Sequence, residues 1–143
     1  MHLSTLLKKT NRLLLKRANE LIKPYAINHA YTFILMELFN KDGLTQTELV
    51  QLIEVEQPTA VRTLDRMERD GFIMRTPSTS DRRAVHIYLT EKGKNTKNDL
   101  MHSASLLNQQ ALKGFTEKEQ LELRQFMARV LDNLKVNNHG VSG

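Results

Sequence analysis

Apolar residues recur near the amino terminus at the spacing of an amphipathic helix. They stand three, four or seven positions apart, at Leu3, Leu6, Leu7, Leu13, Leu14, Ala18, Leu21, Ile22 and Tyr25. Because an α-helix turns once in about 3.6 residues, this spacing gathers them on one face. Lysines and arginines fill the other face, and Pro24 marks the expected end. We therefore predict a first helix within residues 1–25.

Two further amphipathic helices are predicted at the carboxyl end. The first ends near Gly114, and the next opens with a capping box of Thr116 and Glu119. Their apolar stripes consist of Leu100, Ala104, Leu107 and Ala111, and of Leu123, Phe126, Met127, Val130, Leu131 and Leu134. Such stripes are covered either by the chain's own core or by a second copy across a symmetric interface. We predict the second copy, with residues 1–25 and 95–136 as dimerisation helices and a frayed tail, VNNHGVSG.

The centre of the chain carries the signals of a helix-turn-helix. An apolar segment over residues 28–40 predicts a buried helix, closed by Asp-Gly at residues 42–43. Thr45 and Glu48 form a second capping box, which opens a helix of about two turns, with Leu44 and Leu49 placed as a hydrophobic staple. A break follows, and Pro58 begins the next helix, which Gly71 ends. Two short helices joined by a tight turn are typical of DNA-binding proteins.

The second of these helices has two contrasting faces. Its apolar face holds Ala60, Val61, Leu64 and Met67, and its opposite face holds Thr59, Arg62, Thr63 and Arg66, with Gln57 at the amino-terminal edge. Arginine binds guanine or phosphate, glutamine binds adenine, and threonine contacts the thymine methyl group or a phosphate. The face therefore suits duplex DNA. The alternative interpretation is a solvated surface where the arginines pair with neighbouring acidic residues.

A two-stranded wing is predicted after Gly71. The segment FIMRT is β-prone, and AVHIYL alternates, with Val85, Ile87 and Leu89 on one face. The connecting turn contains Asp81, Arg82 and Arg83. A wing tip beside a recognition helix can enter the minor groove, where arginine is favoured because a narrow groove concentrates negative potential. We expect the carboxylate of Asp81 to pair with an arginine and orient it; a plain solvated hairpin tip is the alternative.

Composition limits the classes of function. The chain has 143 residues, enough for one domain with a real core, and a net charge of +5, which suits a nucleic-acid partner. It has no cysteine, which excludes disulfides, thiol chemistry and cysteine-ligated metals. No apolar run reaches the roughly 20 residues of a membrane span, and the first residues do not form a signal peptide, so a cytoplasmic location without membrane contact is expected.

Enzymatic motifs are missing as well. The five histidines show no metal-ligand spacing, and the sequence contains no HExxH, Walker A or GxSxG pattern. We therefore expect no catalysis, no metal site and no cofactor. The competing non-enzymatic class is a winged helix that binds protein or RNA, in which the recognition helix usually becomes apolar or acidic; here it stays polar and basic.

Residues 44–93, LTQTELVQLIEVEQPTAVRTLDRMERDGFIMRTPSTSDRRAVHIYLTEKG, resemble the winged helix-turn-helix core of the MarR family of transcriptional regulators. The most specific parts are QPTAVRTLDRMERDGFI, the DRR wing and the closing LTEKG. The resemblance implies a mostly α fold with a small β wing, in which residues 28–93 form the DNA-binding core and the flanking helices form the dimer. It also implies a homodimer that binds a near-palindromic operator in double-stranded DNA as a repressor.

The resemblance also implies roles for individual residues. Arg83 matches the family's minor-groove arginine and Asp81 the aspartate that orients it, while Arg75 matches an arginine at the base of the wing, near phosphate. Positions on the recognition helix are matched by Gln57, Pro58, Thr59, Arg62, Thr63 and Arg66. Many relatives bind a small, often aromatic or anionic, effector between the dimer base and the winged helix, and release of DNA by such an effector is expected here. Residues expected near such a pocket are Tyr25, His29, Tyr31 and Phe33, with packing in the core as the alternative. Oxidant sensing through cysteine is absent.

Overall fold

The computed structural model describes the backbone of residues 1–140 and the side chains of residues 1–135. Of the tail expected to fray, residues 141–143 lie outside the described residues. The chain divides into two compact units, residues 1–107 and 108–143, and the boundary falls in the last turns of one helix.

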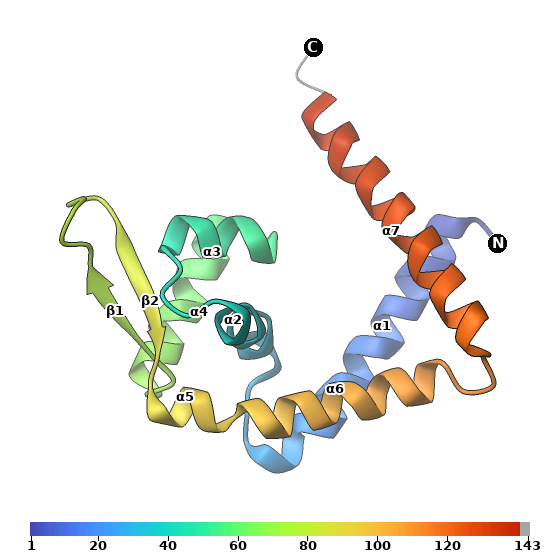
Figure 1. Cartoon of the computed structure of the whole chain (residues 1–143), viewed down its shortest axis with the longest axis horizontal. Helices are drawn as coiled ribbons and strands as arrows, with labels where there is room; N and C mark the ends of the chain where they lie inside the picture. Colours follow the sequence, from blue (N-terminus) through green and yellow to red (C-terminus); the bar gives the residue numbers. More distant parts are fainter. Residues whose placement is uncertain (141–143) are drawn as a thin grey trace. The chain divides into compact units, whose positions relative to one another are not determined.

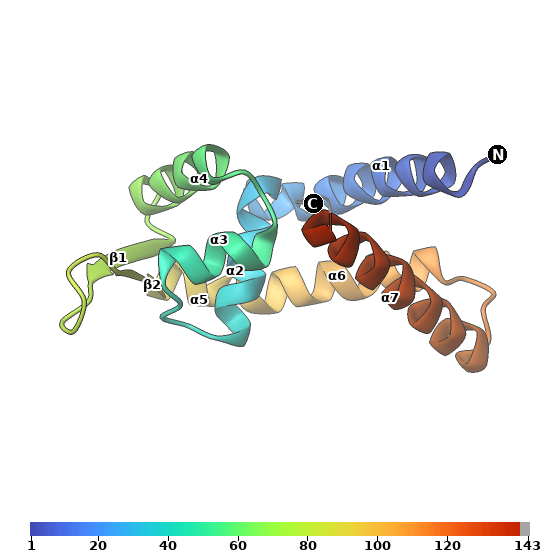
Figure 2. The ribbon, with the colours of Figure 1, turned by 90° about the horizontal axis from the view of Figure 1, so that it is seen from above.

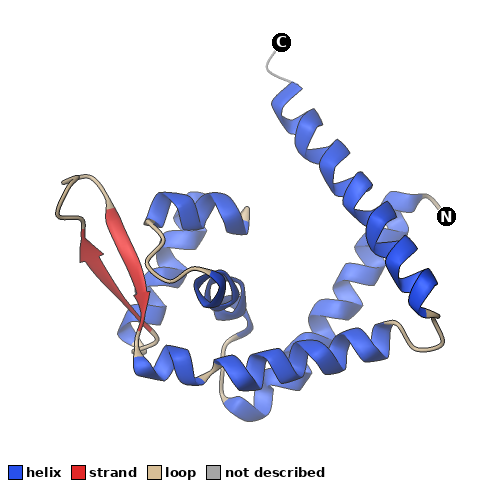
Figure 3. Ribbon diagram, viewed as in Figure 1, coloured by secondary structure: helices blue, strands red, loops and turns tan. Residues whose placement is uncertain are grey.

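The order of elements matches a mostly helical fold with a small sheet (Figures 1 and 3). The α-helices are α1 (Leu3–Ile22), α2 (His29–Asn40), α3 (Gln46–Ile53), α4 (Gln57–Arg69), α5 (Glu91–Asn95), α6 (Lys97–Ala111) and α7 (Glu117–Gly140). A 3₁₀ turn, η1 (Lys23–Tyr25), follows α1, and the antiparallel strands are β1 (Ile73–Pro77) and β2 (Val85–Leu89). The predicted class, mostly α with a small β wing, is confirmed.

The predicted helix boundaries follow from local chemistry. The Thr45 hydroxyl accepts a hydrogen bond from the amide of Glu48 at 3.1 Å and so caps α3. Pro58 lies in the first turn of α4, where no intrahelical N–H is needed. After α4 the backbone of Gly71 adopts φ +85°, a conformation that strains any residue with a Cβ. These three signals fix the helix-turn-helix in the chain.

One hydrophobic core holds the first unit together. Helix α2 packs against α1, α3, α4 and β2, and it contributes Ile34, Leu35 and Leu38, each at most 1 % exposed. Leu49 of α3, Leu64 and Met67 of α4 and Ile87 of β2 are fully buried with them. Because both helices of the helix-turn-helix and the wing share this core, they are positioned as one body.

The wing is a hairpin anchored at its base (Figure 2). Ile73 pairs with Leu89 and Pro77 with Val85, so the strands run antiparallel over five residue pairs. Ile87 also exchanges main-chain hydrogen bonds of 2.9 and 2.8 Å with Gly43 and Leu44, just before α3. Figures 1 and 2 show the connecting loop projecting away from the helices of this unit. The wing is therefore fixed at one end and free at its tip.

The short helix α5 was not among the predicted elements. The hydroxyl of Thr90 caps it by accepting from the amide of Gly93 at 3.1 Å. A Cβ on Gly93 would collide with the main-chain carbonyl of Phe72, so only glycine allows this close approach. The closing LTEKG segment is thus a turn of helix packed against the base of the wing.

The second unit presents an exposed apolar stripe. Its helix α7 opens with the predicted capping box, because Thr116 and Glu119 exchange hydrogen bonds of 2.8 and 3.1 Å. Between 38 % and 57 % of each of these apolar residues is exposed: Leu123, Phe126, Met127, Leu131 and Leu134. Val130, on the same stripe, is half-buried. Leu3, Leu6 and Leu13 of α1 are more than half exposed as well. No helix in the described part of the chain is both long and apolar enough to cross a bilayer.

Candidate nucleic-acid interface and ligand pocket

Helix α4 buries one face and exposes the other, as predicted. Ala60, Leu64 and Met67 are at most 1 % exposed. The residues on the outward face are Gln57, Pro58, Thr59, Arg62 and Arg66, which are exposed, and Thr63, which is half-buried. The Thr63 hydroxyl donates to the carbonyl of Thr59 at 3.0 Å, and Arg62 Nε donates to that of Pro58 at 3.3 Å. The outward face is therefore polar, basic and accessible.

The acidic residues near Arg62 and Arg66 form ion pairs with other arginines. Asp65 and Glu68 bind Arg75, and Asp70 binds Arg69. Among the described residues, neither Arg62 nor Arg66 forms an ion pair. The interpretation of α4 as a surface where these two arginines are neutralised by their neighbours is therefore not what the structure shows, and both guanidinium groups keep their charge for an external anion.

Arg75 is engaged within the protein rather than projecting from it. Its side chain is 22 % exposed, and its Nη2 lies 2.7 Å from Asp65 and 2.9 Å from Glu68. The main-chain N–H of Arg75 donates to the second oxygen of Glu68 at 3.1 Å. These hydrogen bonds hold the pKa of the Glu68 carboxyl below its ordinary value and raise the pKa of Arg75. Arg75 thus braces strand β1 against α4.

The wing tip is shaped by side chains that bind the main chain. The carboxylate of Asp81 accepts a hydrogen bond from the main-chain N–H of Arg83 at 2.9 Å. Ser78 Oγ accepts from the amides of Ser80 and Asp81 at 3.2 and 3.3 Å. In the described part of the chain Asp81 forms no ion pair with a guanidinium. Aspartate orders turns in this way two residues ahead of itself, so it sets the loop from which the exposed Arg82 and Arg83 project.

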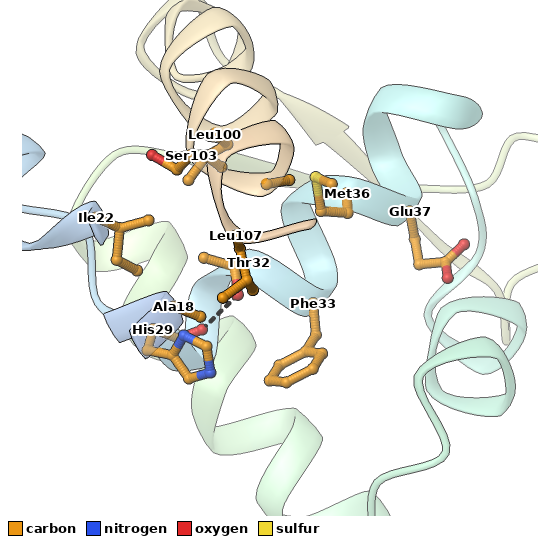
Figure 4. Close-up of a pocket in the computed structure, with 11 residues that line it drawn as sticks. Ala18, Ile22, His29, Thr32, Phe33, Met36, Glu37, Leu100, Ser103 and Leu107 are labelled. Carbon is orange, nitrogen blue, oxygen red and sulfur yellow. Dashed lines mark hydrogen bonds between the residues drawn. The ribbon is translucent and has the colours of Figure 1, made fainter. Parts of the chain in front are cut away.

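A pocket of about 260 Å³ opens in the first unit, between α1, α2 and α6 (Figure 4). Of the four candidate effector residues, His29 and Phe33 line this pocket. Their rings are arranged edge to face, with 5.5 Å between the ring centroids. Tyr25 lines a separate hollow beside Lys92. Tyr31 is buried in the core, where its hydroxyl donates to Asp70 at 2.6 Å. The structure therefore brings together two of the four.

Most of the pocket wall consists of residues that the sequence did not suggest for it. They are Ala18, Ile22, Thr32, Met36, Glu37, Leu100, Ser103, Ala104 and Leu107. Thr32, Met36 and Glu37 continue the helical face of His29 and Phe33, so a search at intervals of three and four residues finds them. The contribution of α6 depends on tertiary packing, although Leu100, Ala104 and Leu107 already formed one predicted face. The described residues contain no cluster of acidic or histidine side chains suited to a metal ion.

Comparison with known proteins agrees with this geometry. A sequence model of the MarR family matches residues 27–85. The HTH-type transcriptional regulator YybA of Bacillus subtilis (strain 168) is 29 % identical over 101 residues, which cover 71 % of this chain and 67 % of that protein. The crystal structure of the transcriptional regulator PA3341 is 33 % identical, covers 94 % of this chain and 98 % of its own, and superposes with a TM-score of 0.83.

A relative bound to DNA has the same fold. A mutant of MarR from E. coli complexed with operator DNA is 26 % identical and superposes with a TM-score of 0.84, over 90 % of this chain and 93 % of its own. The exposed basic recognition helix, the arginine-tipped wing and these similarities lead to one assignment: the chain belongs to the MarR family of winged helix-turn-helix transcriptional regulators.

Proposed function

We propose that this regulator is a repressor that binds a near-palindromic operator as a homodimer and leaves it when a small molecule binds. The observation that carries the DNA-binding part is the pairing pattern around α4. Asp65 and Glu68 are occupied by Arg75, which leaves Arg62 and Arg66 on the outward face without ion pairs in the described structure. A relative with the same fold has been crystallised on operator DNA.

Two parts of the surface have separate roles in this proposal. Gln57, Thr59, Arg62, Thr63 and Arg66 contact base edges and phosphates in the major groove, beginning at the turn that contains Pro58. Arg82 and Arg83 at the wing tip reach the adjacent minor groove, where Arg83 is the inserted side chain. Residues 28–93 thus serve as the DNA-binding core.

Homodimerisation is proposed from the apolar stripes of the terminal helices. On α7 the stripe runs from Leu123 to Leu134, and all of its large apolar side chains except the half-buried Val130 are at least 38 % exposed. A second copy covers such a stripe through an interface in which each chain offers the same patch. Residues 1–25 and 95–136 are the proposed dimerisation helices. A two-fold dimer then requires an operator with two inverted half-sites.

Selection from a random pool of DNA duplexes at a fixed salt concentration tests this function. We expect enrichment of an inverted repeat whose half-sites lie about one helical turn, roughly 10 base pairs, apart. A variant with both Arg62→Ala and Arg66→Ala serves as control and is expected to enrich no sequence. Placing the selected site across a promoter should lower reporter expression when the protein is present.

A winged helix specialised for protein or RNA is the competing function. It predicts no enriched duplex and only weak binding of DNA whose affinity does not depend on sequence. For a protein that contacts several phosphates, the logarithm of duplex affinity falls steeply and linearly with the logarithm of salt concentration. If duplex affinity does not change with salt concentration and the selection enriches no sequence, the DNA-binding function is rejected and binding of protein or RNA is favoured.

A further inference from the structure

We propose that Thr59 and Thr63, one turn apart on the outward face of α4, contact DNA through different groups of the same type of side chain. Thr63 offers its methyl group and selects a base that carries a methyl group at C5, such as thymine. Thr59 offers its hydroxyl group as a hydrogen-bond donor. The inference rests on the proposed function, because it requires α4 to lie in the major groove of an operator.

The hydroxyl group of Thr63 is already used within the helix. Its proton is donated to the main-chain carbonyl of Thr59, with 3.0 Å between the two oxygens. A hydroxyl group has a single proton, so Thr63 has no second hydrogen bond to donate to a base or a phosphate. The bond also turns the hydroxyl oxygen of Thr63 towards the main chain of α4.

The methyl group of Thr63 is the branch that remains for DNA. The hydroxyl and methyl groups leave Cβ at a tetrahedral angle, so the methyl group does not follow the hydroxyl group towards the main chain. Residue 63 is half-buried on the face that also presents the exposed Thr59, Arg62 and Arg66. In the major groove a T·A pair displays the C5 methyl group of thymine, which accepts apolar contacts. The methyl group of Thr63 is therefore suited to meet a thymine methyl group.

The hydroxyl group of Thr59 is in the opposite situation because of its place in the helix. The carbonyl four residues earlier belongs to Val55, which precedes the N-cap residue Glu56 and lies outside α4. In the described part of the chain, no protein group accepts the proton of this hydroxyl. Thr59 is exposed in the first turn of α4, the end of a recognition helix that contacts bases. Its hydroxyl group is thus available to an acceptor on a base edge or a phosphate.

Replacement of single thymines in the selected operator tests the role of Thr63 on the unchanged protein. Deoxyuridine differs from thymidine only in lacking the C5 methyl group. We expect one position in each half-site at which this replacement weakens binding about fourfold, the effect of one buried methyl group. Replacement in both half-sites should weaken binding about sixteenfold, because distant contacts add. At the same position, a C·G pair methylated at C5 of cytosine should bind about fourfold more tightly than an unmethylated one.

Two substitutions at each threonine separate the methyl group from the hydroxyl group. Thr63→Ser removes the methyl group and should abolish the preference for thymidine over deoxyuridine at that position. Thr63→Val removes the hydroxyl group and should keep this preference. At Thr59 the pattern reverses, so that each pair of variants is the control for the other. Thr59→Ser should bind the operator like the unchanged protein, whereas Thr59→Val should bind it about fivefold more weakly, the effect of one hydrogen bond.

The outcomes distinguish this inference from the proposed function. If Thr63→Val loses the preference for thymidine and Thr63→Ser keeps it, Thr63 acts through its oxygen and the inference is wrong. An operator whose binding depends on Arg62, but on no thymine methyl group through Thr63, rejects the inference and keeps the proposed function. A selection that enriches no duplex rejects both.

Discussion

The hydroxyl of Tyr31 donates a 2.6 Å hydrogen bond to the carboxylate of Asp70, and this contact joins α2 to the residue that caps α4. Helix α2 also carries His29 and Phe33, which line the pocket between α1, α2 and α6, and α4 carries Arg62 and Arg66 on its exposed face. The contact therefore ties α2 to the carboxyl end of α4. The contact spans 39 positions in the chain and lies at the edge of the core.

The first prediction concerns the pH dependence of this contact. The hydrogen bond from Tyr31, followed by that from Arg69, holds the pKa of Asp70 below its ordinary 3.8. Because the folded-state pKa is the lower one, the stabilisation is complete above the unfolded-state pKa and is lost as the pH falls through the folded-state pKa. Tyr31→Phe should therefore lower the free energy of unfolding near neutral pH and have a smaller effect at a pH below the folded-state pKa of Asp70.

Urea unfolding at both pH values measures this difference. The control is Tyr25→Phe, which removes the hydroxyl of an exposed tyrosine and should leave stability unchanged. An equal effect of Tyr31→Phe at both pH values would show that the hydroxyl stabilises the fold without the charge of Asp70.

The second prediction concerns Arg62 and Arg66. If either guanidinium reads a base, its alanine variant should lose about 1–3 kcal/mol of binding free energy on the selected operator and relax the preference at one position in each half-site. If it contacts only phosphate, all sequences should weaken alike and the salt slope should fall by about one. The control is Arg12→Ala, which removes the same positive charge from α1 instead of α4. Unchanged binding in both recognition-helix variants would contradict the proposed interface.

The third prediction concerns Asp81 and the wing. Arg83→Ala should weaken operator binding strongly with little effect on thermal stability, because Arg83 is exposed at a loop tip. Asp81→Ala removes the acceptor that holds the N–H of Arg83 and should also weaken binding, although it removes a negative charge near DNA. Asp81→Asn keeps an acceptor oxygen without the charge, so it should bind DNA at least as tightly as the unchanged protein.

Binding titrations of these variants separate the explanations. If Asp81 acts by shaping the turn, Asp81→Asn should keep the operator affinity that Asp81→Ala loses. If it acts by pairing with a guanidinium, both substitutions weaken binding. In a double-mutant cycle, Asp81→Ala should cost much less once Arg83 is alanine, because Arg83 is the side chain that the turn positions. Tighter binding by Asp81→Ala in the presence of Arg83 would contradict any orienting role.

The fourth prediction concerns Arg75, for which the resemblance implies a position near phosphate. A brace between β1 and α4 predicts that Arg75→Ala weakens operator binding without changing the salt slope, whereas loss of a phosphate contact lowers the slope by about one. The pKa of Glu68, held low by Arg75, should rise towards its ordinary value, as NMR titration can show. Loss of the two ion pairs should lower the free energy of unfolding by only about 1 kcal/mol, because solvent screens the attraction between Arg75 and the exposed carboxylates. Arg75→Lys keeps the charge but not the forked geometry, and should rescue only in part.

The sequence was sufficient to predict the helix-turn-helix and the wing, because their signals are local. The capping residue Thr45, the prolyl turn at Pro58 and Gly71 act on their immediate neighbours, and the structure has helix boundaries at all three. The alternation of Val85, Ile87 and Leu89 was likewise visible without tertiary information, and Ile87 and Leu89 are buried.

The sequence did not show which charged residues form ion pairs, because such pairing depends on how distant segments approach in the fold. Asp65 and Glu68 stand beside Arg62 and Arg66 in sequence, yet both bind Arg75, which β1 brings to α4. For the same reason Tyr31 and His29, two residues apart on one helix, have separate surroundings. Helical rotation turns Tyr31 into the core and His29 towards the pocket.

The last prediction concerns assembly. Leu131 and Leu134 are 49 % and 56 % exposed on the apolar stripe of α7, and a charge at either position opposes burial against a second copy. Leu131→Asp should therefore shift sedimentation at micromolar concentration from about twice the chain mass of 16.5 kDa towards the monomer. Operator affinity should fall with it, because one half-site supplies too few contacts. Gln125→Asp adds the same charge on the opposite face of α7 and should leave the dimer intact. A monomer in the unchanged protein, or equal effects of both variants, would contradict an interface built on this stripe.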